Sequence, residues 1–225
     1  MFAKLPFKIA WRYFRERKGE KFISIISSFS LIGVMLGVAS LIIVMAIMNG
    51  FHKELVKNII GLNSDITITP YEQSHIANHQ AIISELEKMT FISKVNPIIQ
   101  GQALASNQEK AIGVIIKAMN LTDLKTKRVI VDNIIAGDLC NFVGNNKIAM
   151  GTYLANNLKL NIGDKIRLFS PQTVSTALGS IPRSKEFELV AIFASGMYDY
   201  DSANILMPMS AAQQYFGMKD KINHI

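Results

Sequence analysis

No Asp, Glu, Lys or Arg occurs between Phe22 and Phe51. About 20 apolar residues are enough for a helix to cross a bilayer, and a longer run can tilt or project beyond the surface. A secretory signal has an apolar core of only about 7–15 residues, followed by a cleavage site with small residues. This run is longer and continues into FHKELVKNII without such a site. It therefore predicts a retained transmembrane helix over residues 22–51.

The positive charge of the chain is concentrated before this helix. The formal net charge is +7, and residues 1–21 alone carry seven basic and two acidic side chains. A nucleic-acid-binding surface would spread basic residues over the folded body, so no nucleic-acid partner is expected. Basic flanks of a membrane helix stay in the cytoplasm. We therefore expect residues 1–21 to be a basic cytoplasmic N-terminus and residues 52–225 to be exported, which in a bacterium means the periplasm.

Within the apolar run, Gly33 and Gly37 form the GxxxG spacing in GVMLG. Small residues at this spacing let two helix backbones approach closely in a membrane. Further serines and alanines surround the pair, which an anchor alone would not need. The pattern favours packing of this helix against other membrane helices, with chance spacing as the alternative.

Residues 52–225 alternate between strand-like and helix-like patterns. Leu55, Ile59 and Leu62 continue the membrane helix, and Gly61 is its expected stop. We expect strands at 65–69, 93–106, 110–119, 147–151, 166–169, 186–193 and 203–208, and helices at 76–89, 152–159 and 210–217, the last with Ser210 as N-cap. This order predicts an α+β domain with a split β-α-β unit and a β-rich subdomain, whose closing strand and helix are not evident before the sequence ends.

The sequence contains few candidates for catalytic or metal chemistry. It has no phosphate-binding loop, no HExxH and no paired CxxC. His75 and His79 have the i,i+4 spacing of a zinc pair, but two solvated polar residues at a helix start are the favoured interpretation. The cluster Tyr198 to Asp201 is interpreted as a polar turn, and Cys140 as a partly buried structural thiol. We expect no metal, no cofactor and no enzymatic activity in this chain.

The segment SPQTVSTALGSIPRSKEF, residues 170–187, separates two strand-like runs without a two-residue turn signal. A hairpin loop of this length is usually either functional or disordered. Both alternatives stay open for this segment on its residues alone.

Four stretches together resemble a known family. They are AWRYFRERKGEKFIS, the apolar run ending in MNGFHKELVKNIIGL, GTYLANNLKLNIGDKIRLFSP, and LGSIPRSKEFELVAIFASGMYDYD. The chain is similar to the LolC/LolE permeases of the lipoprotein-releasing ABC transporter, within the MacB/FtsX-like superfamily. The resemblance covers nearly the whole chain, but members have three further membrane helices. It therefore implies that this sequence is the N-terminal part of such a permease, truncated within a MacB-like fold.

The resemblance implies specific partners in the inner membrane and the periplasm. They are a cytoplasmic LolD-like ATPase that holds ATP and Mg²⁺, a second permease subunit, identical or paralogous, lipoprotein substrates, membrane lipid and a LolA-like periplasmic carrier. The family's carrier-binding hook maps onto one run within the hook-like loop 170–184, namely Pro171, Gln172, Thr173, Val174, Ser175, Thr176, Ala177, Leu178, Gly179, Ser180, Ile181 and Pro182. The supporting pad maps onto Arg167, Ser184 and Lys185.

Met45, Met48 and Phe51 lie near the expected outer-leaflet end of the helix and are candidate lipoprotein contacts, because methionine adapts to varied apolar partners. Ordinary lipid-facing or helix-packing roles remain an alternative for each.

The hook sequence departs from the family in being about one residue shorter and in having no proline at its tip. Two other functions stay open: a MacB-like or FtsX-like transporter subunit, and a single-span periplasmic sensor or interaction protein.

Overall fold

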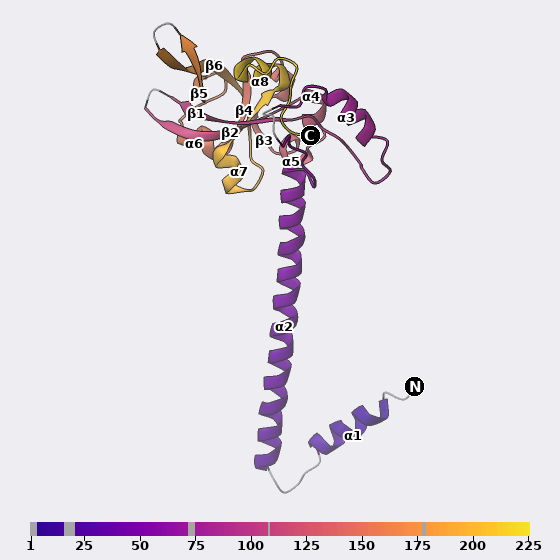
Figure 1. Ribbon diagram of the computed structural model, residues 1–225. Coiled ribbons are helices and arrows are strands. Elements are labelled where there is room, and N and C mark those ends of the chain that lie inside the picture. Colours follow the sequence, from indigo (N-terminus) through magenta and orange to yellow (C-terminus); the bar gives the residue numbers. More distant parts are fainter. Residues whose placement is uncertain (1–3, 16–20, 72–74, 108, 177–178) are drawn as a thin grey trace. The chain divides into compact units, whose positions relative to one another are not determined.

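The computed structural model describes residues 4–15, 21–71, 75–107, 109–176 and 179–225 (Figure 1). The chain divides into two compact units, Met1–Val56 and Lys57–Ile225, and each is described by itself. The division lies five residues beyond the predicted end of the membrane segment at Phe51.

The first unit is helical. It contains α1 (Lys4–Arg15) and most of α2 (Lys21–Leu62), a helix of 42 residues. The stretch Ile25–Val56 of α2 is long and apolar enough to cross a membrane and has no buried residues in this structure. As the spacing of Leu55, Ile59 and Leu62 predicts, α2 continues past Phe51. No helix was predicted within the basic N-terminus, where α1 lies. Pro6 is in the first turn of α1, where proline is tolerated.

The second unit is an α+β domain. Its elements after α2 are α3 (His79–Leu86), β1 (Ile99–Ser106), β2 (Ala111–Met119), α4 (Leu121–Leu124), α5 (Arg128–Val131), β3 (Ile134–Gly137), η1 (Leu139–Asn141), β4 (Lys147–Gly151), α6 (Thr152–Asn157), β5 (Lys165–Thr176), β6 (Gly179–Phe193), α7 (Tyr198–Ala203), β7 (Asn204–Pro208) and α8 (Met209–Phe216).

The described strands form one seven-stranded sheet in the order β3-β6-β4-β7-β2-β1-β5. Strand β6 also pairs with β5, so the other strands are linked in a ring that leaves out β3, which lies beside the C-terminal part of β6. Pairs β2–β7 and β4–β6 are parallel, and the remaining pairs are antiparallel. The edge that remains among the described strands is that of β3, which pairs only with β6.

Two apolar clusters pack on opposite faces of the sheet, and consecutive residues of one strand contribute to each. In β7, Ile205 and Met207 belong to the first cluster and Leu206 to the second. This follows from the alternation of side chains along a strand. All five residues of β7 are buried, as expected for a strand covered on both faces. Helix α8 packs on β1, β2 and β7, whereas α6 and α7 pack next to β4 (Figure 1).

The structure corrects several sequence-based expectations. Residues 65–69 are described but form no strand; Ile68 instead exchanges backbone hydrogen bonds with Ile225, which the local alternation cannot reveal. Ser210 lies inside α8, which starts at Met209, so the N-cap is Pro208, two residues before the expected one. The expected polar turn at Tyr198–Asp201 is the first part of α7, with Tyr200 and Asp201 buried.

Candidate functional site

Strands β5 and β6 form a long hairpin, not the loop that the sequence suggested. Thr173 to Thr176 pair with Gly179 to Pro182 in an antiparallel ladder. The expected loop over residues 170–184 was wrong in this respect, because β-branched and small polar residues carry the pairing almost to the tip. The hairpin projects from the sheet (Figure 1). Ala177 and Leu178, the predicted tip of the hook, lie outside the described residues.

A register shift separates this hairpin from the rest of the sheet. Phe169 pairs with Ser184, but the next pair is Thr173 with Pro182, so β5 has more residues than β6 between the two pairs. Exposed Pro171 lies within this interval, and Ser170 before it is buried. A bulge is a position where a strand tolerates proline, and it bends the ladder locally. The predicted hook, residues 171–182, therefore begins at a bend of the ladder.

The pad residue Arg167 lies below this bend on β5. Its Nη2 donates to Oε1 of Glu186, which is directly opposite on β6, at 2.5 Å. The two side chains are 55% and 52% exposed, so solvent screens the ion pair and it contributes at most about 1 kcal/mol to stability. Arg167 is consequently held in a defined position at the surface without being buried.

The pad residue Lys185 has a different environment. Its Nζ donates to Oε1 of Gln214 in α8 at 2.7 Å and lies 5.4 Å from the centre of the Phe187 ring. Burial lowers the pKa of Lys185 from its ordinary value. Lys185 therefore joins the hairpin to α8.

The three pad residues do not share one surface. In an antiparallel ladder, directly opposite residues are on the same face, and neighbours along a strand are on opposite faces. Arg167 pairs with Glu186 and Phe169 with Ser184, which places Arg167 and Ser184 on one face. Lys185 is opposite the buried Leu168, on the face that α8 covers. The structure thus brings together Arg167 and Ser184 and separates Lys185 from them.

Sequence reasoning missed three residues at the base of the hairpin. Glu186 pairs with Arg167, Gln214 accepts from Lys185, and Nη1 of Arg183 donates to the backbone oxygen of Tyr215 at 3.3 Å. Arg183, Lys185 and Phe187 alternate along β6, which places them on one face of the sheet. This alternation could have indicated that one packing element contacts all of them. The partner helix itself, about thirty residues later in the sequence, could not be identified from a local pattern.

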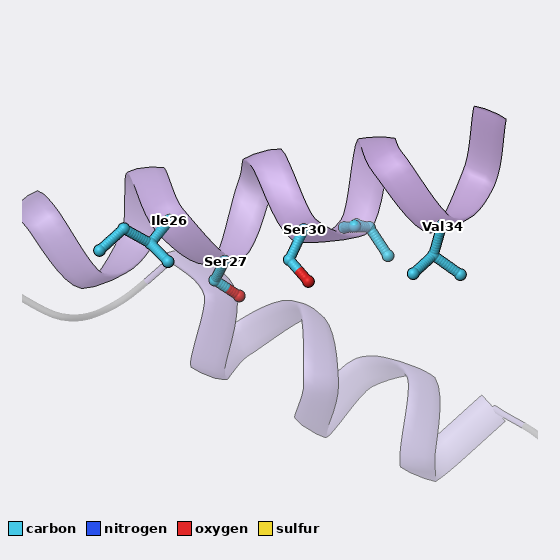
Figure 2. A pocket seen from close by; sticks show the side chains of 5 residues that line it. Ile26, Ser27, Ser30 and Val34 are labelled. Carbon is cyan, nitrogen blue, oxygen red and sulfur yellow. The ribbon is translucent and has the colours of Figure 1, made fainter. Parts of the chain in front are cut away.

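The residues singled out in α2 lie on one side of the helix. With 3.6 residues per turn, Gly33, Gly37, Met45, Met48 and Phe51 fall within about 120° of the circumference. Met45, Met48 and Phe51 are exposed, and no atom lies within 4 Å of a Cβ built on either glycine. The side chains of Ser27, Ser30 and Val34 also project to a common side, next to an open hollow of about 590 Å³ (Figure 2).

The described residues contain no cluster of three or more His, Cys, Asp and Glu side chains that could hold a metal ion. His75 and His79 are half-buried, and the Nδ1 of each has no hydrogen-bond partner among the residues that the structure describes, so the expectation that both are solvated was wrong. Cys140 is exposed, contrary to the expected partly buried thiol, because η1 presents it outward while Leu139 turns inward. None of these residues lies in the β5–β6 hairpin.

The sequence matches the family described as MacB-like periplasmic core domain over residues 27–225. Among similar proteins, a lipoprotein-releasing system transmembrane protein LolC of Neisseria meningitidis is 26% identical over 215 residues, covering 95% of this chain and 52% of the relative. A lipoprotein-releasing system transmembrane protein LolE of Haemophilus influenzae is 28% identical over 215 residues, covering 93% of this chain and 51% of the relative. The chain thus spans about half the length of these curated relatives.

Among solved structures, the extracellular domain of the noncanonic ABC-type transporter YknZ from Gram-positive bacteria aligns with a TM-score of 0.47 at 12% identity. The alignment covers 71% of this chain and 81% of that domain.

Proposed function

The chain belongs to the MacB-like periplasmic core domain family, and on this premise we propose that it is part of a permease subunit of a lipoprotein-releasing ABC transporter. The single observation that carries the proposal is its relation, over nearly its whole length, to proteins named as LolC and LolE of lipoprotein-releasing systems. In this proposal the subunit extracts lipoproteins from the outer leaflet of the inner membrane and transfers them to a soluble periplasmic carrier.

The proposed orientation places the basic N-terminus in the cytoplasm and residues 52–225 in the periplasm. The excess of Lys and Arg before α2 supports this arrangement through the positive-inside rule. A separate cytoplasmic ATPase, binding ATP and Mg²⁺, supplies the energy, and the chain itself has no phosphate-binding loop sequence. A second permease subunit, identical or paralogous, completes the membrane part.

The β5–β6 hairpin is the proposed docking element for the carrier. A paired ribbon keeps its direction better than an irregular loop, so it presents the hook at a defined position with less ordering cost on binding. Arg167 and Ser184, on one face below the bend, form the proposed pad. Lys185 supports the ribbon from the other face through Gln214.

The exposed side of α2 is the proposed path for the lipoprotein. Gly33 and Gly37 provide a surface for close helix packing, and Met45, Met48 and Phe51 provide apolar side chains farther along the same side. In this arrangement the partner subunit packs near the glycines, and the acyl chains contact the methionines. Closure of the two subunits, driven by the ATPase, then expels the lipid toward the carrier.

Photo-crosslinking of the whole chain in membranes tests carrier docking. A photoreactive amino acid at Val174, within the hairpin, is expected to trap a purified LolA-like carrier in a one-to-one adduct. The same probe at Phe91, an exposed side chain outside the hairpin, serves as the matched control. Adducts of equal yield from both positions, or none from Val174, contradict the proposal.

The family description itself names MacB, so a MacB-like or FtsX-like role is the second candidate. In that case the same fold transmits movement to a periplasmic partner without handling lipoproteins. A lipoprotein that crosslinks to probes at Met45 or Met48 favours lipoprotein release, whereas a carrier-independent adduct at the hairpin favours the second candidate.

A further inference from the structure

A small basic cavity lies in the second unit, away from the β5–β6 hairpin. Its volume is about 60 Å³, and its walls come from the segment after α2, the first residues of β1, the end of β2, the turn before α5 and the C-terminal segment. The lining residues are Asn63, Ser64, Thr67, Ile98, Gln100, Lys117, Met119, Lys127, His224 and Ile225. A cavity of about 10–15 Å³ holds one water, so this one has room for a few waters or one small ion.

Three basic side chains from different elements meet in this cavity: Lys117, Lys127 and His224. Burial lowers the pKa of each of them, and a neighbouring lysine lowers it further: Lys127 acts on Lys117, Lys94 on Lys127, and Lys117 on His224. The positive charges therefore oppose one another, and an anion placed between them would relieve that repulsion.

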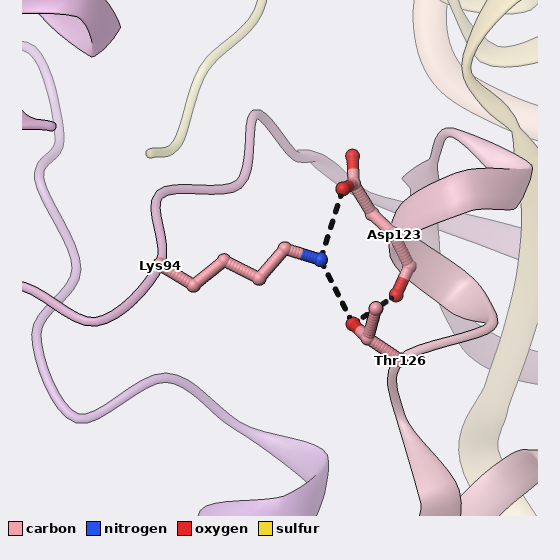
Figure 3. A network of polar contacts seen from close by, with 3 residues as sticks. All are labelled: Lys94, Asp123 and Thr126. Carbon is pink, nitrogen blue, oxygen red and sulfur yellow. Dashed lines mark hydrogen bonds and ion pairs between the residues drawn. The ribbon is translucent and has the colours of Figure 1, made fainter.

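The nearby acidic group is engaged elsewhere. Asp123, which raises the pKa of Lys127, forms an ion pair with Lys94 at 3.2 Å, and Lys94 also donates to Oγ1 of Thr126 at 2.9 Å (Figure 3). No acidic side chain is among the described residues that line the cavity. The negative charge of Asp123 therefore offsets the positive charges of the cavity lysines only in part.

The cavity groups are held in place before any ligand binds. Nζ of Lys117 donates to Oδ1 of Asn63 at 2.9 Å and lies 5.0 Å from the centre of the Tyr200 ring. The backbone of His224 exchanges hydrogen bonds with Ile98 at 2.9 and 3.1 Å, whereas its buried Nδ1 has no partner among the described residues. An unpartnered buried ring nitrogen is costly unless a ligand or water satisfies it.

We propose that this cavity binds a phosphate group through Lys117, Lys127 and His224, either as a free anion or as the head group of a lipid. The ammonium groups supply point charges of the kind that bind phosphate, and Nδ1 of His224 supplies a hydrogen bond. The volume admits a single phosphate group and excludes a nucleotide. The proposal is independent of the lipoprotein-releasing function and of the β5–β6 hairpin.

The first test uses the whole chain in a non-ionic detergent and a chloride buffer free of phosphate and sulfate. Titration with inorganic phosphate is expected to give saturable binding by calorimetry. The double variant Lys117→Gln with Lys127→Gln is expected to bind at least tenfold more weakly. Lys88→Gln, which removes one exposed lysine outside the cavity, is the control and should bind like the original chain.

Two further variants separate loss of the site from loss of the fold. Lys127→Gln alone removes a cavity charge without disturbing the Lys117–Asn63 hydrogen bond, and Lys117→Arg keeps the charge. We expect weakened binding in the former and partial retention in the latter, with unchanged far-UV circular dichroism in both. Ile225 lines the cavity and ends the sequence, so the titration is repeated on a chain with two added C-terminal residues. Binding that persists supports the side-chain site, and binding that is lost overturns it.

Lysine acetylation footprinting by mass spectrometry distinguishes the two sources of phosphate. The chain is reconstituted into vesicles of phosphatidylcholine alone or with phosphatidic acid. Protection of Lys117 and Lys127 by inorganic phosphate in the neutral vesicles identifies a free anion. Protection that requires phosphatidic acid identifies a lipid head group. If neither condition protects these lysines more than Lys88, the cavity binds no phosphate and the proposal is wrong.

Discussion

Arg167 and Lys185 belong to neighbouring pairs of the β5–β6 ladder, yet their side chains are on opposite faces of the sheet. Arg167 forms an ion pair with Glu186, whereas Lys185 donates a hydrogen bond to Gln214 of α8. The two positive charges at the base of the hairpin are therefore not equivalent. Arg167 is exposed on the proposed docking face, whereas Lys185 joins the hairpin to α8.

This difference predicts unequal effects of charge reversal on carrier binding. Arg167→Glu is expected to weaken binding of a LolA-like carrier about tenfold at low salt, because it places a negative charge beside Glu186 on the proposed docking face. Lys165→Glu, on the same face and strand but farther from the hairpin, is the matched control and should change affinity less than twofold. Surface plasmon resonance at two salt concentrations measures both. Equal effects of the two substitutions would remove Arg167 from the pad.

Lys185→Met is expected to act on the hairpin and not on charge recognition. It removes the bond to Gln214 but keeps an apolar stem against the Phe187 ring, so we expect faster amide hydrogen exchange in residues 179–185. Carrier affinity should fall because the loosened hairpin has to be ordered when the carrier binds. The salt dependence of binding should not change. A change in the salt dependence alone, with unaltered exchange, would instead assign Lys185 to the docking surface.

The buried lysines predict a rise of stability with pH. Burial lowers the pKa of Lys117 and Lys127 below the unfolded value of 10.5, so the unfolded chain binds more protons in the window between the folded and unfolded pKa values. Stability must then increase as the pH rises through this window. Urea unfolding in phosphate-free neutral detergent should show this rise as the pH increases toward the unfolded pKa of 10.5, and the double variant Lys117→Gln with Lys127→Gln should flatten it.

The pH range of that measurement is limited by two tyrosines. Burial raises the pKa of Tyr200 and Tyr215 above the ordinary value of 10.0. Above about pH 10 the unfolded chain therefore releases tyrosine protons that the folded chain retains, which lowers stability and opposes the lysine effect. A slope in the double variant equal to that of the original chain, measured below this limit, would contradict the assignment to Lys117 and Lys127.

A side chain at Gly151, the last residue of β4 before α6, is expected to clash with its neighbours. A Cβ at this position would lie 2.2 Å from the backbone oxygen of Asp201, and the other nearest atoms also belong to the Asp201 backbone. Gly151→Ala should lower the free energy of unfolding by about 1–3 kcal/mol, because backbone cannot move aside as a flexible side chain can. Gly113→Ala in β2 meets nothing within 4 Å and should be neutral or stabilising by up to about 1 kcal/mol. Chemical denaturation of both variants provides the comparison.

A large side chain on the side of α2 that carries Gly33 and Gly37 is expected to weaken helix association. Gly33→Leu is expected to reduce association of the chain with a second membrane helix several-fold, because the added side chain separates the helix backbones. Ala39→Leu lies on the other side of the helix, about 200° from Gly37, and is the control. Energy transfer between labelled chains in nanodiscs measures association. Equal losses in both variants would show that these glycines do not form the contact.

The site was predictable from sequence in its location but not in its geometry. The strands flanking the hairpin follow from alternation in KIRLF and FELVAIF, and Pro171 indicates an interruption between them. The register shift after Phe169 depends on how many residues each strand contributes to the bend, and it determines which face each side chain occupies. A shift by one residue would exchange Arg167 for its neighbours on the proposed docking face, so no local pattern could assign the residues of the proposed pad.

The sequence by itself determined the long apolar helix, the concentration of positive charge before it and the α+β character of residues 57–225. These properties depend on residues close together in the chain, whose hydropathy and periodicity act locally. Only the tertiary structure decided the closed ring of strands, the pairing of Ile68 with Ile225 and the meeting of Lys117, Lys127 and His224 in one cavity. Those contacts join segments far apart in sequence, and they form because packing of both sheet faces selects one arrangement from many with similar local preferences.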